Sequence, residues 1–206
     1  MTNTAAERIS RRQVDKFEDR RRQLADAALQ TLASLGYART SLRDIAQNSA
    51  FSVGVLHYYF RDKVELITYC VRRYKAQCVE RYDAIVANAV DLEGLLRGAG
   101  DGLAATLEQD ALLHRLWYDL RSQSLFEESF RPDVADIDAS LERMIWRIVT
   151  AYAALSGIET PRCTSALVYA AFDGLFQQAL LRHLAGDPSA LDDLRAGTRA
   201  LLIGLV

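Results

Sequence analysis

Apolar residues recur three and four positions apart along almost the whole chain, and few residues interrupt this spacing. Only 3 of the 206 residues are proline and 11 are glycine, so the backbone can stay helical over long stretches. No segment alternates apolar and polar residues with the period of two that is typical of a half-buried strand. The pattern predicts an all-α fold of nine helices.

Glycine and short polar residues mark the expected helix ends. The first helix is expected over about residues 15–35, and Gly36 follows it, where helices commonly end in a left-handed residue. Thr40 and Ser41 can each cap a short second helix, Ser52 can cap a short third one, and Asp62 can cap a long fourth one. The remaining helices are expected over residues 92–107, 109–125, 132–156, 161–185 and 188–205.

Charge divides the chain into a basic head and an acidic body. Residues 1–63 carry 11 Lys and Arg against 7 Asp and Glu, a net charge of +4, and residues 64–206 carry 14 against 20, a net charge of −6. This asymmetry suggests that only the head approaches a polyanion. We expect a flexible N-terminal arm over residues 1–14, a DNA-binding domain over 15–63 and a helical body over 64–206. The arm is either a solvated tail or a segment that enters a minor groove.

Several classes of protein are disfavoured by what the sequence lacks. The N-terminus does not have the basic-then-apolar order of a secretory signal, and no apolar run is long enough to cross a membrane. Three cysteines without a C-x-x-C pair predict neither a disulfide framework nor a zinc site. No nucleophile elbow, H-E-x-x-H or Gly-rich phosphate loop is present. We therefore expect a cytoplasmic protein that is not an enzyme and needs no metal or cofactor.

The segment from residue 40 to residue 63 reads TSLRDIAQNSAFSVGVLHYYFRDK. Two short helices with a tight connection between them are the arrangement of a helix-turn-helix, in which the second helix presents its N-terminal residues to the major groove. A helical adaptor that has lost DNA binding is the alternative, and it would carry a neutral or acidic head.

Specific residues of this segment suit DNA chemistry. Thr40 and Ser41 offer hydroxyl groups and backbone N–H groups to a phosphate at a helix N-terminus. Arg43 has the forked donor geometry that pairs with guanine. Ser52, Val53 and Gly54 open the expected recognition helix, where the missing side chain of glycine permits close approach to base edges.

The same string resembles the signature of the TetR family of transcriptional regulators, above all in H-Y-Y-F-R-D-K and in the preceding Leu-Gly-Tyr. The resemblance implies that His57 occupies the position of a phosphate-contacting tyrosine, that Tyr58 lies on the DNA face and that Lys63 binds a phosphate. Tyr59 is either a further contact or half-buried.

The sequence departs from the family pattern at three positions. Ala50 stands where the turn usually has glycine, and Phe51 replaces a smaller aliphatic residue, which we expect to wedge the two short helices apart. The imidazole of His57 would make its phosphate contact sensitive to pH.

The resemblance also implies a body that binds a small molecule and forms a homodimer, so that a repressor leaves a palindromic double-stranded DNA operator when its effector binds. The stretches RLWYDLRSQ and FDGLFQQALL loosely resemble the subgroup related to the regulator of choline-to-betaine synthesis, and no ligand is inferred from them. We expect a small, largely apolar or aromatic effector, although the aromatic residues could equally be core. The residues predicted to line the effector site are Trp117, Tyr118, Arg121, Phe172 and Phe176.

The last two expected helices carry more apolar surface than one small body can cover. Residues 167–184 are apolar nearly all round, and the final helix has a narrow seam of 3-4-3 spacing. A second copy of the chain would cover both helices, whereas a single buried central helix in a monomer is the alternative. The predicted dimer residues are Phe172, Leu175, Leu191, Leu194, Leu201 and Leu205.

Overall fold

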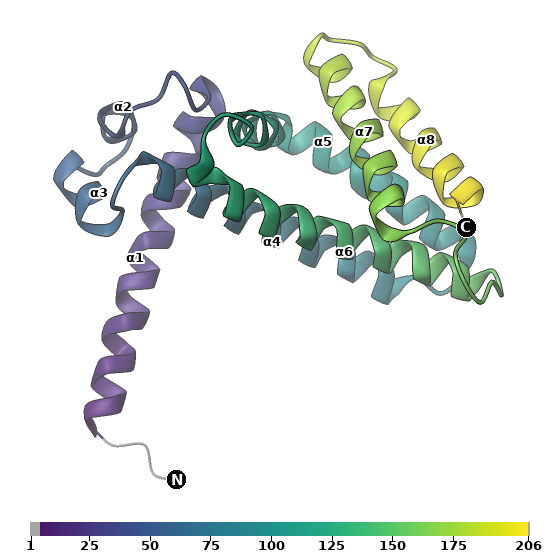
Figure 1. Cartoon of the computed structure of the whole chain (residues 1–206), viewed down its shortest axis with the longest axis horizontal. Coiled ribbons are helices and arrows are strands. Elements are labelled where there is room, and N and C mark those ends of the chain that lie inside the picture. Colours follow the sequence, from purple (N-terminus) through teal and green to yellow (C-terminus); the bar gives the residue numbers. More distant parts are fainter. Residues whose placement is uncertain (1–4, 206) are drawn as a thin grey trace. The chain divides into compact units, whose positions relative to one another are not determined.

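The computed structural model describes the backbone of residues 5–205 and the side chains of residues 13–205. The regular elements of this part of the chain are all helices, joined by turns and loops and without a strand, which confirms the predicted all-α fold (Figure 1). The elements are α1 (Ala5–Leu35), α2 (Leu42–Gln47), α3 (Val53–Tyr59), α4 (Lys63–Asn88), α5 (Leu92–Gln123), the 3-10 helix η1 (Glu128–Phe130), α6 (Arg131–Leu155), α7 (Ser165–Leu184) and α8 (Ala190–Leu205).

The largest differences from the expected helix ranges are in α1 and α5. The first helix begins at Ala5, so the segment expected to be a flexible arm is helical from that residue on, and residues 1–4 lie outside the described part. The helices expected over residues 92–107 and 109–125 are one continuous α5 with a kink at Asp110, where φ is −123° and ψ is 22°. The described part therefore has eight α-helices instead of nine.

Glycines and hydroxyl residues end and begin the helices as their chemistry requires. Gly36, Gly157 and Gly186 have φ values of 77°, 70° and 81°, the left-handed region that side chains disfavour. Thr164 caps α7 by accepting a hydrogen bond from the N–H of Leu167 at 3.3 Å. The seventh helix thus begins after Thr164 and not at the predicted residue 161.

The chain forms two compact units whose boundary does not follow the predicted domains. The head unit contains the described residues up to Arg72 together with Leu116–Phe130, and the body unit contains Arg73–Arg115 and Arg131–Val206. The end of α5, which the sequence assigns to the body, therefore belongs to the head unit. Each of the long helices α4 and α5 contributes residues to both units.

Within the head unit, α1, α2 and α3 pack around one apolar core. Fully buried side chains from each helix and from the start of α4 form it: Leu24, Leu32, Ile45, Leu56, Phe60 and Leu66. Burying a leucine or phenylalanine side chain of this kind contributes about 1.5–3 kcal/mol to stability. This core fixes α2 and α3 against α1.

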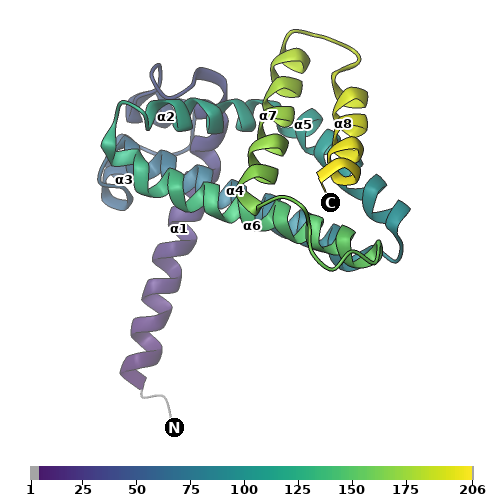
Figure 2. The ribbon, with the colours of Figure 1, turned by 45° about the vertical axis from the view of Figure 1, so that its right-hand side comes forward.

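In the body unit, α7 lies beside α8 and against α6, and Figure 2 shows the pair α7–α8. Small residues permit close approach: a Cβ added at Gly197 of α8 would lie 2.8 Å from Cδ1 of Leu175 on α7. Ion pairs on the surface link further helices, as where Arg199 of α8 binds both carboxylate oxygens of Glu93 on α5.

Candidate nucleic-acid interface

The start of α2 is fixed by a reciprocal capping arrangement. The hydroxyl of Ser41 accepts from the N–H of Asp44 at 3.2 Å, and the Asp44 carboxylate accepts from the N–H of Ser41 at 2.7 Å. The hydrogen bond from the Ser41 hydroxyl, followed by that from its N–H, lowers the pKa of Asp44. Ser41, the cap, and Arg43, in the first turn of α2, are both exposed to solvent, and their contact with DNA stays a prediction.

The short helix α3 has one buried face and one exposed face. Leu56 is fully buried, and the hydroxyl of Ser52 caps the helix by accepting from the N–H of Val55 at 3.3 Å. The exposed residues are Ser52, Gly54, His57 and Tyr58, while Val53 and Val55 are half-buried. A helix that is anchored on one side and exposed along the other can enter a major groove.

Tyr58 and Tyr59 differ in exposure, and an aromatic residue of α1 supports both. Tyr58 is 73% exposed, while Tyr59 is half-buried. The ring of Phe17 lies 4.8 Å from that of Tyr59 and 6.3 Å from that of Tyr58, measured between centroids. Tyr59 therefore packs against α1, and Tyr58 is the better placed of the two to contact a ligand.

Two of the predicted phosphate contacts point into the protein. Thr40 is only 3% exposed, and its hydroxyl donates to the carbonyl of Gly36 at 2.7 Å. The Nζ atom of Lys63 donates to the carbonyl of Tyr37 at 3.0 Å and lies 3.9 Å from the centroid of the Tyr37 ring. The hydroxyl of Thr40 is thus part of the turn before α2, and Lys63 could reach a phosphate only by giving up these contacts.

The turn after α1 also binds the end of α5, which the sequence patterns did not indicate. The N–H of Tyr37 donates to Oδ2 of Asp119 at 2.7 Å, and the Tyr37 hydroxyl donates to Glu127 at 3.1 Å. The ring of Phe130 meets the Tyr37 ring edge-on, with centroids 5.0 Å apart. Partial burial, followed by the hydrogen bond to Glu127, raises the pKa of Tyr37. Tyr37 therefore joins α4 and α5 to the head.

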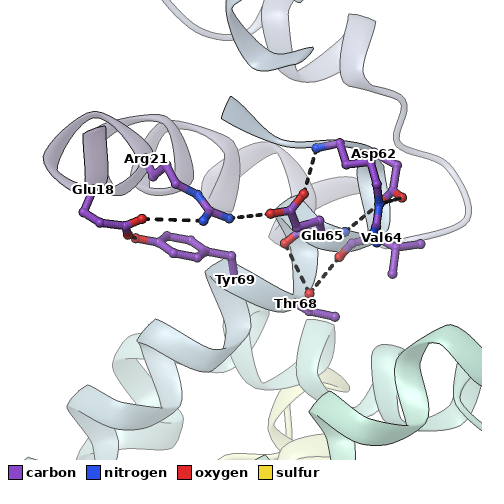
Figure 3. Close-up of polar contacts among 8 residues, drawn as sticks. Glu18, Arg21, Asp62, Val64, Glu65, Thr68 and Tyr69 are labelled. Atoms are coloured by element: carbon purple, nitrogen blue, oxygen red, sulfur yellow. Dashed lines mark hydrogen bonds and ion pairs between the residues drawn. The ribbon is translucent and has the colours of Figure 1, made fainter. Parts of the chain in front are cut away.

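A second polar network holds α1 to the start of α4, as Figure 3 shows. Arg21 binds Glu65 at 2.6 Å and Glu18 at 3.6 Å, and its guanidinium lies over the rings of Phe60 and Tyr69. Glu65 in turn accepts a hydrogen bond from the N–H of Arg61 at 2.7 Å. Arg21 is therefore a structural residue of the head.

The body unit contains a buried polar cluster centred on His114. Tyr74 Oη lies 2.8 Å from His114 Nε2, Lys75 Nζ lies 3.0 Å from Nδ1, and the ring of Phe176 packs on the imidazole at 4.6 Å. An ammonium group can only donate, so Nδ1 accepts, and the neutral ring carries its proton on Nε2 and donates it to Tyr74. Burial, with a smaller contribution from Lys75 and Arg81, lowers the pKa of His114 well below its ordinary value.

The predicted effector residues are divided between the two units. Trp117, Tyr118 and Arg121 belong to the head unit, whereas Phe172 and Phe176 belong to the body unit, where both are buried. Of these residues, Phe176 lies in the polar cluster of His114. The predicted lining as a whole stays a prediction.

The predicted dimer residues are only partly accessible. Phe172 and Leu194 are 3% and 0% exposed within a single chain, so a second copy cannot pack on them. The half-buried members are Leu175, Leu191, Leu201 and Leu205. Periodicity identified the helices but did not separate their inner from their outer faces.

None of the helices in the described part is long and apolar enough to cross a membrane. Among the side chains that the structure describes, no group of three His, Cys, Asp or Glu could hold a metal ion.

Comparisons with known proteins agree with this geometry. Residues 24–70 match the family described as bacterial regulatory proteins, tetR family. The chain is 27% identical over 188 residues to the HTH-type transcriptional regulator BetI of Cronobacter sakazakii, and the alignment covers 87% of each protein.

Solved structures with the same fold include two that hold different ligands. FadR from Bacillus subtilis, in complex with stearoyl-CoA, has a TM-score of 0.72 at 18% identity over 89% of this chain and 98% of FadR. A putative transcriptional regulator from Saccharomonospora viridis, in complex with choline, has a TM-score of 0.71 at 19% identity over 91% of this chain and 97% of that one.

Proposed function

Since the chain belongs to the TetR family and is a DNA-binding transcriptional regulator, we propose that it is a repressor that leaves a palindromic operator when a small molecule binds the body unit. The observation that carries this proposal is the open face of α3 and its cap, where Ser52, Gly54, His57 and Tyr58 are exposed on a helix anchored by Leu56. We place the protein in the cytoplasm, where it meets DNA, and assign it no catalytic activity.

The exposed residues of α2 and α3 divide by the DNA groups they suit. The guanidinium of Arg43 can donate to guanine O6 and N7, while Gly54 lets the backbone approach base edges. A Cβ added at Gly54 would meet only Oγ of Ser52, at 3.9 Å, so the space in front of it is open. His57 and Tyr58 offer polar hydrogens to phosphates, and these contacts set the register of α3 on the duplex. The N–H and the hydroxyl of Ser41 both donate to Asp44, so Ser41 could donate to a phosphate only by giving up one of these hydrogen bonds.

We propose a homodimer through the outer faces of α7 and α8. Large apolar side chains are exposed there, among them Leu167 and Leu181 on α7 and Ile203 on α8. Gly174 and Gly204 add open positions, because a Cβ on either would meet nothing within 4 Å. A second copy of the same two helices would cover this surface with two-fold symmetry, and a palindromic operator has the same symmetry.

We place the effector in the body unit, with its polar end toward His114 and its apolar part toward Phe176. The neutral imidazole orients the Tyr74 hydroxyl and the Lys75 ammonium, through its two ring nitrogens, beside the aromatic ring of Phe176. Buried polar groups of this kind orient ligands in otherwise apolar sites. FadR and the Saccharomonospora viridis regulator are similar in fold and bind an acyl thioester and a quaternary amine, so both classes are candidates.

Selection of duplexes from a random-sequence library by the full-length protein tests the DNA-binding proposal. We expect an enriched inverted repeat whose half-sites lie about 34–36 Å apart, or a multiple of that distance. Enrichment of a single asymmetric half-site contradicts the palindrome, and no enrichment contradicts sequence-specific binding.

Thermal-shift measurements with stearoyl-CoA and choline, followed by release of the selected duplex, test the effector proposal. A hundredfold release requires an effector that prefers the released state by about 2.7 kcal/mol, which is ordinary for allosteric coupling. Phe176→Ala should abolish release and leave DNA affinity nearly unchanged. If stability and DNA affinity fall together, Phe176 is a core residue.

A further inference from the structure

Three consecutive arginines on α1 have three different environments. Arg21 lies inside the head, in the network with Glu18 and Glu65. Arg22 is half-exposed and forms an ion pair with Asp19 on the same helix. Both positive charges are thus matched by carboxylates of the protein itself.

Arg20 is held differently, by stacking. Its guanidinium carbon lies 4.7 Å from the centroid of the Phe51 ring, and Nη1 donates to Oε1 of Gln23 at 2.8 Å. Among the side chains that the structure describes, no carboxylate forms an ion pair with Arg20. The residue is exposed, so its positive charge faces solvent in a fixed orientation.

The position of Arg20 relates it directly to the recognition helix. Phe51 immediately precedes Ser52, the residue that caps α3. Phe17, one turn before Arg20 on α1, packs against Tyr58 and Tyr59 at the other end of α3. The face of α1 that carries Phe17 and Arg20 therefore runs along α3.

We propose that Arg20 is a further DNA contact, which binds a backbone phosphate beside the groove that α3 enters, and that Phe51 is the positioning residue for it. This inference rests on the proposed DNA binding. Phosphate is the ligand because a guanidinium fork matches its oxygens and is weakly hydrated enough to stack on a ring at the same time. Stacking on Phe51 also restricts the rotamers of Arg20, which lowers the entropy lost on binding.

The same proposal accounts for the large residue at position 51. A smaller aliphatic side chain would fill the turn between α2 and α3 but would offer no ring to a guanidinium. Phe51 is half-buried, so one part of its ring packs in the turn while another supports Arg20. Sequence patterns indicated only the expected wedging of the two helices.

The test measures binding of a fluorescein-labelled duplex, selected by the wild-type protein from a random library, at several salt concentrations. Each phosphate contact that is lost reduces the slope of log K against log salt by about 0.9. Arg20→Ala should weaken binding and lower the slope by about that amount. Arg22→Ala is the matched control, because it removes another exposed arginine of α1 whose charge is already paired with Asp19; the slope of this variant should be unchanged.

Two further variants separate the contact from its positioning. Arg20→Lys keeps the charge and should retain the slope, with weaker binding because an ammonium does not stack or bind bidentately as a guanidinium does. Phe51→Leu should weaken binding while the melting temperature and helical circular dichroism persist. In the Arg20→Ala background, Phe51→Leu should reduce DNA affinity little further, since there is no guanidinium left to position.

The outcomes distinguish this inference from the function on which it rests. If the wild-type protein enriches a duplex and Arg20→Ala keeps the full salt slope, Arg20 is not a contact and DNA binding stands. If Phe51→Leu weakens binding equally with and without Arg20, Phe51 does not act through it. If the wild-type protein enriches no duplex, both the proposed function and this inference are wrong.

Discussion

The backbone N–H of Tyr37, in the turn after α1, donates to the carboxylate of Asp119 near the end of α5 at 2.7 Å. Residues 116–130 belong to the head unit although they lie far from it in the sequence, and this hydrogen bond is one of the contacts that join them to it. The turn that it supports leads directly into α2. Any change that moves the end of α5 therefore acts on the helix-turn-helix through this carboxylate.

Asp119→Ala should destabilise the head by about 1.5–3 kcal/mol, because a hydrogen bond to a charged acceptor is lost and a partly buried N–H is left without it. Urea unfolding measures this change. Tyr37→Phe is the milder comparison, since it removes only the hydroxyl contact with Glu127. If Asp119→Ala costs no more than Tyr37→Phe, the backbone contact does not support the turn.

Lys63→Met should lower the free energy of unfolding by about 1 kcal/mol, since it removes the hydrogen bond to the Tyr37 carbonyl and the cation–π contact. We expect the salt slope of DNA binding to change by much less than in Arg20→Ala. A decrease of about 0.9 would show that Lys63 leaves Tyr37 in the complex and binds phosphate as the family resemblance implies.

The buried imidazole of His114 should make stability depend on pH. Its pKa is lowered in the folded protein, while the unfolded chain takes up a proton near pH 6.5. Stability from this group is therefore complete above that pH and is lost as the pH falls, by up to about 1.4 kcal/mol per pH unit.

Urea unfolding between about pH 5 and pH 7 checks this dependence. His114→Gln should remove most of the dependence of the unfolding free energy on pH, whereas His183→Gln, at the end of α7, should retain it. Equal slopes in wild type and His114→Gln would mean that other groups govern the acid side of the stability profile.

Leu181→Glu should yield folded monomers on a sizing column, because Leu181 is 64% exposed within one chain and lies on the outer face of α7. Leu194→Glu should instead unfold the body unit, since that side chain is fully buried and an unpaired carboxylate there is costly. A Leu181→Glu protein that stays dimeric would move the interface away from α7.

Local patterns in the sequence predicted most of the helices and the helix-turn-helix segment. Caps at Ser41 and Ser52 and the left-handed Gly36 depend on neighbouring residues only, so they were predicted correctly. At Asp110 the sequence predicted a break between two helices, whereas the structure has a kink within one helix. An interruption of the helical pattern does not show whether the chain changes direction or continues as a helix at once.

The parts of the site that were missed depend on residues distant in sequence. The roles of Arg20 and Arg21 are decided by Phe51 and Glu65, which periodicity along α1 does not reveal. Thr40 was misjudged for a different reason, since its partner Gly36 is only four residues away: a hydroxyl suits a phosphate as well as it suits a carbonyl. The spacing of apolar residues indicates which face of a helix is buried. Only the tertiary fold shows which residues pack against that face.

Tyr37 contacts Lys63, Asp119, Glu127 and Phe130 with different parts of one residue: its carbonyl and ring face, its N–H, its hydroxyl and its ring edge. The residues at these positions therefore depend on one another. A related chain without an aromatic residue at position 37 loses the reason to keep a lysine at 63 and an aromatic residue at 130, so we expect these positions to vary together. Asp119 should follow a different rule: it receives a backbone N–H, which every residue except proline supplies, and can persist when Tyr37 does not.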